Sequence, residues 1–289
     1  KLEKQYEKEL IHNYQLALKE IRARIAFIYE KYDGNWIEMN RYNRITKLEK
    51  EIAEEIRKLT GKNAQSLIRG LMETYEEAYY RTAYVLTSAV NADLAFSLLD
   101  RELVRKSIEN PLDRVGFLQR NRENQARLTR QLRENLTQSL IQGESYRTAA
   151  KRIKERMDVG ATNVLRITRT EMHRTRQQSK LEGMKDGAAR GVILKKHWLA
   201  TIDDRTRDRH GRLDGKQVDL DEQFEIDGFK AEAPGLFGVP EMDINCRCDV
   251  LEVVEGFEAR HRRVRGLGIV KYATYEEFKK GLRHQKVHD

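Results

Sequence analysis

The chain has 289 residues, of which 39% are hydrophobic and 35% are charged, and its formal net charge is +9. The charged fraction exceeds the roughly 25% of ordinary globular domains and favours long helices with solvated faces. The three prolines argue against disorder and against an all-β fold, and the absence of a long apolar run excludes a membrane span. The excess of Lys and Arg suits an anionic partner. Because the chain begins with Lys-Leu-Glu-Lys, we expect the start of the gene product to be missing and no secretory leader.

Long amphipathic helices are expected over the first hundred residues. From residue 1 to about 60, apolar residues recur at three- and four-residue spacing, with a break at Asp33-Gly34-Asn35. The apolar positions are Leu10, Tyr14, Leu18, Ile21 and Ile25. A second stretch, from Asn63 to about Asp100, places on one face Leu67, Leu71, Tyr75, Ala78 and Tyr79. These faces predict an antiparallel hairpin or bundle.

Helical signals resume after Asn110-Pro111, where the residue before a proline disfavours the α region. We expect a helix over 114–143, another after the candidate N-cap Ser145, and a third over 161–186. The pattern then changes: 192–194 and 196–200 carry β-branched and aromatic residues typical of short strands. Glycines make 203–248 loop-like, and 248–254 predicts a final strand.

These elements predict a mainly α fold, in which an elongated helical N-terminal body precedes a small α+β C-terminal domain. We divide the chain into a long-helix region (1–104), a domain over 105–254 with its α+β element at 190–254, and a basic extension (255–289). From Gly256 to the end, nine Lys or Arg outnumber four Asp or Glu, a net charge of +5. We expect this extension to be mobile or docked on a partner, with a short helix from Tyr275 to Leu282.

Metal-binding residue types are concentrated between residues 197 and 248. Both cysteines, Cys246 and Cys248, lie there, and His210 and His197 are the nearest imidazoles on their N-terminal side. A structural zinc ion takes four Cys or His ligands, so these four residues are candidate ligands of one zinc ion that would stabilise the α+β domain. The alternative is a pair of reduced thiols packed as small hydrophobic residues.

Polar residues near this segment allow two interpretations, a hydrolytic metal site or an ion-pair network that fixes the loops, and we favour the network. The residues are Asp203, Asp204, Arg205, Arg207, His210 and Asp214. Arg169-Thr170-Glu171 lies within a predicted helix, where Glu171 can pair with Arg174. Such a triplet could be mistaken for part of an ADP-ribosyltransferase signature, but the glycine-poor context and the lack of a downstream Glu-x-Glu argue against that class.

Two arginine-rich segments are candidate contacts for DNA phosphates. The first comprises Arg120, Arg127 and Arg130. The second comprises Arg260, Arg262, Arg263 and Arg265. Phosphate contacts give binding that is indifferent to sequence and sensitive to salt. Aromatic residues are not interleaved as on a base-stacking platform, and a solvated helix face is the alternative.

Four separated motifs follow one another over roughly residues 105–254. They are Ile167-Thr168-Arg169-Thr170-Glu171, Lys196-His197-Trp198, Thr201-x-Asp203-x-Arg205-x-Arg207-x-x-His210-x-x-Leu213-Asp214-Gly215 and Asn245-Cys246-Arg247-Cys248. Their order resembles that of the tailed-phage head morphogenesis family, the minor capsid proteins related to the F protein of phage Mu. Each motif alone would be weak, and the shared order makes the resemblance specific.

The resemblance implies a non-enzymatic virion component, made in the host cytoplasm and placed inside the head at the portal vertex. Its implied partners are the portal protein, major capsid or scaffold proteins, and double-stranded DNA during assembly, packaging or ejection. It also implies a structural constellation of Asp203, Arg207, His210, Asp214, Asn245, Cys246 and Cys248, which we extend to Arg169 and Glu171.

Two other function classes stay open. One is a metal-dependent nuclease using Asp203, Asp204, His210 and Asn245. Cysteines follow Asn245 where that reading would need a second catalytic histidine, which favours a closed zinc site. The other is a mobile-element toxin with transferase activity, for which this chain offers no extra enzymatic domain.

Overall fold

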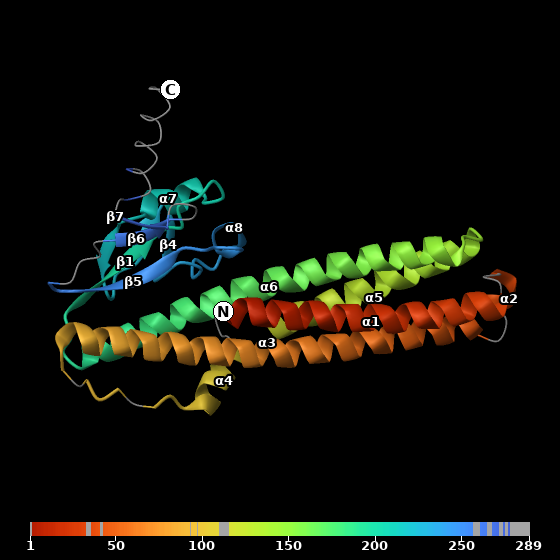
Figure 1. Cartoon of the computed structure of the whole chain (residues 1–289), viewed down its shortest axis with the longest axis horizontal. Helices are drawn as coiled ribbons and strands as arrows, with labels where there is room; N and C mark the ends of the chain where they lie inside the picture. The colour runs from red at the N-terminus through yellow and green to blue at the C-terminus, as the bar shows by residue number, and fades with distance from the viewer. Residues whose placement is uncertain are drawn as a thin grey trace, which may run out of the picture. The chain divides into compact units, whose positions relative to one another are not determined.

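The protein is mainly helical, with a small α+β region toward its C-terminal end (Figure 1), as the sequence predicts. The computed structural model describes residues 2–32, 36–40, 43–92, 94–96, 98–109, 116–256, 261–264, 268–271, 274 and 277. The chain forms two compact units, one of Lys1–Gly70 with Arg105–Arg169 and the other of Leu71–Val104 with Thr170–Asp289. These units are defined by contacts, whereas the predicted boundaries at 104 and 254 divide the chain by sequence and stay a prediction.

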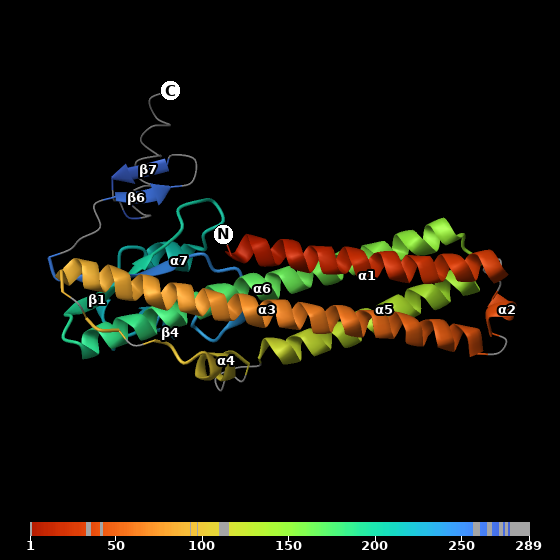
Figure 2. The same cartoon turned by 60° about the horizontal axis from the view of Figure 1, so that its bottom comes forward.

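The first unit is a bundle of amphipathic helices. Its elements are α1 (Leu2–Tyr32), α2 (Trp36–Asn40), the first part of α3 (Arg44–Val90), α5 (Phe117–Ile141) and the first part of α6 (Tyr146–Ala189). The four long helices run alongside one another (Figures 1 and 2). Each contributes residues at helical spacing to one core, for example Ile21, Ile56, Leu132 and Ile153, none of them more than 1% exposed.

Two predicted helix interruptions are wrong. The structure has one helix, α3, where we expected a boundary near residue 60, and α3 ends at Val90 rather than near Asp100. Gly61 lies inside it, and the roughly 1 kcal/mol cost of one helical glycine is small beside the burial on either side. Likewise α6 is continuous through Gly160, where a Cβ would lie 3.1 Å from a Leu128 methyl, so this glycine permits close packing.

One predicted helix start is supported by capping chemistry. Ser145 precedes α6, and its Oγ accepts a hydrogen bond from the Thr148 amide at 3.4 Å, which confirms the predicted N-cap. The breaks expected at Asp33-Gly34-Asn35 and at Asn110-Pro111 lie outside the described residues. None of the described helices combines the length and apolarity needed to cross a bilayer.

The second unit contains the later parts of α3 and α6, the start of α4 (Arg101–Glu109), and the α+β region. A three-stranded antiparallel sheet has the order β2 (Gln217–Asp219), β1 (Leu194–Leu199), β5 (Asp249–Val254). The strands predicted over 192–200 and 248–254 are thus confirmed as β1 and β5. The remaining elements of this region are α7 (Asp208–Leu213), β3 (Phe224–Ile226), β4 (Phe229–Ala231) and α8 (Pro240–Asp243).

The core of this unit is centred on Trp198, which is fully buried in β1. Its indole ring packs edge-on against Phe224 at 5.2 Å between ring centroids. The two cysteines belong to the same core, with Cys246 5% and Cys248 3% exposed. The α+β region therefore encloses its sulfur atoms rather than presenting them to solvent.

The basic extension contains strands that we did not predict. β6 (His261–Val264) and β7 (Gly268–Lys271) form an antiparallel pair. The helix expected over 275–282 lies outside the described residues except for Glu277. Thr274 and Glu277 exchange the hydrogen bonds of a capping box, with the Glu277 amide 3.3 Å from Thr274 Oγ1 and the Thr274 amide 2.7 Å from Glu277 Oε2.

Candidate metal centre

His210 is positioned by α7, whose C-terminal end is tied to the end of β1. The Asp214 carboxylate accepts a hydrogen bond from the Ala200 amide at 2.6 Å, and the Gly215 amide donates to the Trp198 carbonyl at 2.9 Å. Gly215 has a φ of +84°, in the left-handed region that favours glycine. The Asp214-Gly215 turn predicted from the sequence thus anchors the short helix that carries His210.

The cysteines lie on the segment that joins α8 to β5. Asn245 adopts a φ of +56°, a conformation that asparagine tolerates better than most residues. Its backbone N–H donates to Thr170 Oγ1 at 3.3 Å. The Cys246 amide donates to the Asp243 carbonyl at 3.1 Å. Thr201 Oγ1 donates to the Arg247 carbonyl at 2.7 Å. These backbone contacts fix the two cysteines in place beside α7.

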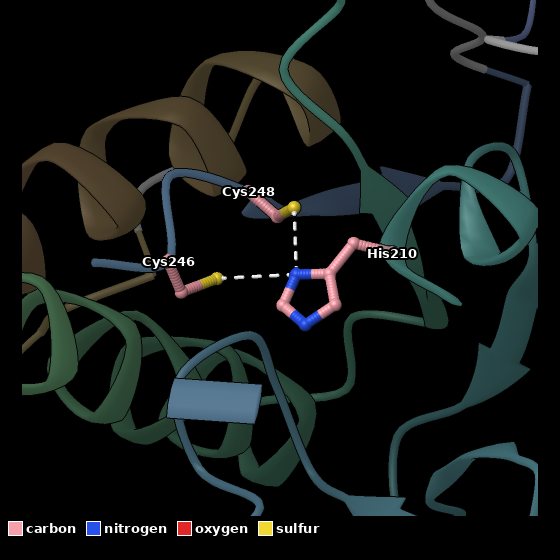
Figure 3. A group of neighbouring side chains, drawn as sticks. All are labelled: His210, Cys246 and Cys248. Atoms are coloured by element: carbon pink, nitrogen blue, oxygen red, sulfur yellow. Dashed lines mark hydrogen bonds between the residues drawn. The ribbon is translucent and has the colours of Figure 1, made fainter. Parts of the chain in front are cut away.

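The three side chains converge on one point (Figure 3). Nδ1 of His210 lies 3.4 Å from Sγ of Cys248 and 3.6 Å from Sγ of Cys246. The three ligand atoms all lie within 4.8 Å of one another, and all three residues are buried. In a tetrahedral zinc site with ordinary Zn–S and Zn–N lengths, a nitrogen and a sulfur ligand are about 3.6 Å apart. The group has the composition and spacing to hold a metal ion.

The two thiols have different acidities. The pKa of Cys246 is held well below its usual value by a hydrogen bond with Cys248 and by further ones with His173 and His210, against the opposing effect of burial. The pKa of Cys248 is raised well above its usual value by the adjacent Cys246 sulfur and by burial. Cys246 is therefore the more readily ionised sulfur, and the thiolate is the form that binds metals.

Aromatic rings hold the His210 imidazole. It meets Trp198 edge-on at 5.7 Å and Phe237 at 6.0 Å between ring centroids. Its Nε2 is buried and makes no hydrogen bond among the described residues, so the polar contacts of the ring are those of Nδ1 with the two sulfur atoms.

The predicted polar cluster supports the loops around this centre. Asp203 makes a bidentate ion pair with Arg247, with Arg247 Nη2 2.7 Å from Asp203 Oδ1. This contact holds the pKa of Asp203 well below its usual range. Arg207 donates from its guanidinium to the Ile244 carbonyl. These contacts are those of a network that fixes the loops, as are the contacts of Asp214 and Asn245 given above.

Other predicted residues lie elsewhere. Arg169 pairs with Glu7 of α1 and belongs to the first unit, and Glu171 is buried at 3% exposure. His197 is not a member of the metal-capable group. Because Trp198 contacts the His210 ring and side chains alternate along a strand, His197 lies on the opposite face of the sheet, which contradicts its predicted place among the ligands.

The arginines predicted to contact DNA are distributed over two regions. In α5, Arg120 is half-buried, while Arg127 and Arg130 are exposed. Arg262 and Arg263 lie in β6, whereas Arg260 and Arg265 lie outside the described residues.

Sequence reasoning missed the face of α6 that holds the cysteine segment. Gln177 accepts a hydrogen bond from the Val250 amide at 3.0 Å and donates to Asp249 at 2.9 Å. Lys180 donates to the Val250 carbonyl at 2.9 Å, and Arg174 forms a buried ion pair with Asp243 at 3.8 Å. The sequence signal for this face is a polar stripe at helical spacing, formed by Arg174, Gln177 and Lys180.

Comparison with known proteins identifies a family that covers part of the chain. A family described as Phage Mu protein F like protein matches residues 130–251, a range that contains the whole metal-capable group. The minor head protein GP7 of Bacillus phage SPP1 is 31% identical over 286 residues, which cover 96% of this chain and 92% of GP7.

A second similar protein has a different activity. The NAD(+)–arginine ADP-ribosyltransferase EFV of Enterococcus faecalis is 31% identical over 263 residues, or 88% of this chain. That match covers only 53% of the transferase, so the chain spans about half of that protein's length. No solved structure gives a significant match.

Proposed function

Since this chain belongs to the phage Mu protein F-like family, we propose that it is a minor structural component of a tailed-phage head. The observation that carries the proposal is the end-to-end similarity to a minor head protein, which extends through both compact units. A match of this extent includes the helical bundle of the first unit, and not only the family region over 130–251.

The proposed partners are the portal protein, with the major capsid or scaffold proteins, and the proposed place is the interior of the head at the portal vertex. The test is co-expression with the portal, scaffold and capsid proteins of the same phage. We expect the chain to co-purify with the portal and to be incorporated into heads. Heads that assemble without it, together with no binding to isolated portal, would refute the proposal.

We also propose that this protein contacts DNA phosphates through the first unit. A groove of about 700 Å³ between α3 and α5 is lined by one acidic and five basic residues, together with small polar and apolar ones. The basic residues are Lys50, Arg57, Arg122, Arg130 and Arg133. Arg57, Arg130 and Arg133 pair with glutamates, while Arg122 and Lys50 make no ion pair with any described residue. Such a groove suits a phosphate chain, and contacts to phosphates do not depend on base sequence.

The metal-capable group is proposed to hold one structural zinc ion. Two sulfur ligands and an imidazole select zinc over magnesium or calcium, which prefer oxygen ligands. Both cysteines and His210 are at most 5% exposed, so an ion held there would stabilise the α+β core rather than meet a large substrate.

We propose that the role is non-enzymatic. The nuclease alternative needs Asp203 and His210 at one open metal, but Asp203 is paired with Arg247 and His210 faces the sulfurs. The region shared with the ADP-ribosyltransferase is also shared with a head protein, so it does not by itself indicate transfer chemistry. Incubation with NAD+ and an arginine acceptor is expected to give no product.

A further inference from the structure

We propose that His173, on α6, is the fourth ligand of a metal ion held by His210, Cys246 and Cys248, which makes the site a closed Cys2His2 zinc centre. The inference rests on the zinc ion proposed above. It replaces His197 in the ligand set predicted from the sequence, and it brings α6 into the metal site.

The first observation is an orphaned imidazole nitrogen. His173 is 7% exposed, and its Nε2 is buried with no hydrogen-bond partner among the described residues. Buried polar atoms nearly always have a partner, so an unpaired one calls for an explanation such as an ion. Imidazole nitrogens are the commonest nitrogen ligands of zinc in proteins.

The second observation is the position of His173 beside the cysteine segment. His173 lies on the face of α6 that contacts the cysteine segment: Thr170 Oγ1 accepts a hydrogen bond from the Asn245 backbone N–H at 3.3 Å, and Arg174 pairs with Asp243 at 3.8 Å. In keeping with this position, the His173 imidazole is one of the groups that lower the pKa of Cys246. His210 approaches the same thiol, at 3.6 Å. Both imidazoles thus act on the Cys246 thiol, although His173 is not within 4.8 Å of every atom of the group of three. The proposal requires the His173 side chain to move toward the three ligand atoms when the metal binds.

The third observation is the glycine that covers the His173 ring. A Cβ at Gly235 would lie 2.8 Å from Cδ2 and 3.3 Å from Nε2 of His173, and the φ of Gly235 is +80°. The loop therefore approaches the nitrogen-bearing edge of the ring with no side chain in between. The glycine thus lets the loop hold the ring in place on the cysteine side of α6.

The alternative fourth ligand, His197, is excluded by strand geometry. It lies in the central strand β1, opposite Gln217 of β2 and Leu251 of β5. Its neighbour Trp198 is the residue that contacts the His210 ring, and successive side chains of a strand point to opposite faces. His197 can join the site only if β1 slips by one residue, which would expel Trp198 from the core.

Charge balance supports the same set. Two thiolates and two neutral imidazoles around Zn²⁺ give a site of zero net charge, which suits a position where all four side chains are at most 7% exposed. Four protein ligands leave no position for an activated water, so the centre is structural and cannot serve the hydrolytic alternative. It would connect α6, α7 and the start of β5 within the second unit.

The test uses the full chain, stripped of metal and titrated with Co²⁺, followed by competition with Zn²⁺. The wild type is expected to give the visible bands of tetrahedral cobalt and the sulfur-to-cobalt charge-transfer band of two Co–S bonds. H173Q is expected to lower zinc affinity by tenfold or more and to weaken the tetrahedral bands as water enters. H173C is expected to keep the tetrahedral bands and to strengthen the charge-transfer band by one further Co–S bond.

H197Q is the matched control, because it removes an equally buried histidine of the same unit, and it is expected to leave affinity and spectrum unchanged. Circular dichroism checks that each variant is folded, and if H173Q does not fold, the H173C spectrum decides. Wild-type spectra in both His173 variants would overturn the inference while leaving the zinc site intact. C248S removes one proposed ligand and is expected to lose metal binding. If the wild type also binds neither metal, the zinc site itself is refuted. Incorporation into heads would still test the structural role.

Discussion

Replacing Gly235 with alanine is expected to destabilise the second unit through contact with a single buried ring. Two effects add. A φ of +80° in an alanine costs about 1–2 kcal/mol, because the left-handed region brings Cβ against the backbone. The new methyl would also lie 2.8 Å from Cδ2 of His173, and relieving such overpacking costs about 1–3 kcal/mol. The expected total is about 2–5 kcal/mol.

Gly238 provides the control for the backbone effect. It lies in the same loop with a φ of +78°, but a Cβ there meets nothing within 4 Å. G238A should therefore cost only about 1–2 kcal/mol, and the difference between the two variants isolates the contact with His173.

The assay is thermal and urea unfolding followed by Trp198 fluorescence, in a background in which Trp36 is replaced by Phe, so that one indole reports on the core of the second unit. Each kcal/mol should lower the melting temperature by roughly 2–4 °C. Zinc affinity measured on the same samples should fall in G235A and stay unchanged in G238A. Equal destabilisation by the two substitutions, with equal zinc affinity, would refute the packing of Gly235 on His173.

Three further predictions concern the metal, an ion pair and the basic groove. Purified protein should carry about one zinc per chain and lose thermal stability on chelation, as expected for a structural site. If the protein contains no metal and its melting temperature is unchanged by the chelator, the cysteines are reduced thiols and not zinc ligands. D203N should destabilise the second unit by roughly 1–3 kcal/mol at pH 7, toward the lower end because Arg247 is partly exposed. The pKa of Asp203 is lowered in the folded state, so its contribution to the free energy of unfolding is complete above the unfolded pKa of about 4 and is lost as the pH falls through the folded pKa. Unfolding at a series of pH values should therefore show the difference in free energy of unfolding between wild type and D203N decreasing in acid. A difference that increases in acid would contradict the ion pair. Combining R122E with R130E should weaken binding to random-sequence DNA and reduce the slope of log affinity against log salt by about one per lost phosphate contact. R81E, which changes an exposed arginine of the second unit, is the control. An unchanged slope in the double variant would show that the groove does not contact DNA.

The helices and the two longer strands were predictable because their periodicity is local. Leu10, Tyr14, Ile21 and Ile25 form one stripe in the sequence and one buried face in α1. Whether a helix continues through a glycine was harder to predict. In the sequence, Gly160 indicates the end of a helix, and only the structure shows that Leu128 packs against it. Whether a glycine interrupts a helix or allows a neighbour to approach depends on tertiary contacts that a single sequence does not contain.

The candidate site shows the same division between local and tertiary information. Cys246, Cys248 and His210 were identified because their residue types are rare and close in sequence. His197 was chosen for the same reason, and strand alternation in β1 places it on the wrong face. His173, the proposed fourth ligand, is 73 residues before Cys246, and it is the packing of α6 against the cysteine segment, through Thr170 and Arg174, that makes it a candidate. Proximity in sequence is a poor guide to ligands when a helix and a strand meet from different parts of the chain.

The burial of the two sulfur atoms has a consequence for the life of a particle. In the proposed role, the protein is made in a reducing cytoplasm and then spends its time in a particle outside the cell, in an oxidising medium. With Cys246 and Cys248 at 5% and 3% exposure, oxidants reach the thiols only when the core around Trp198 opens. The rate at which an alkylating reagent labels them in intact heads would therefore measure how often this domain opens and gives up any bound metal ion during storage.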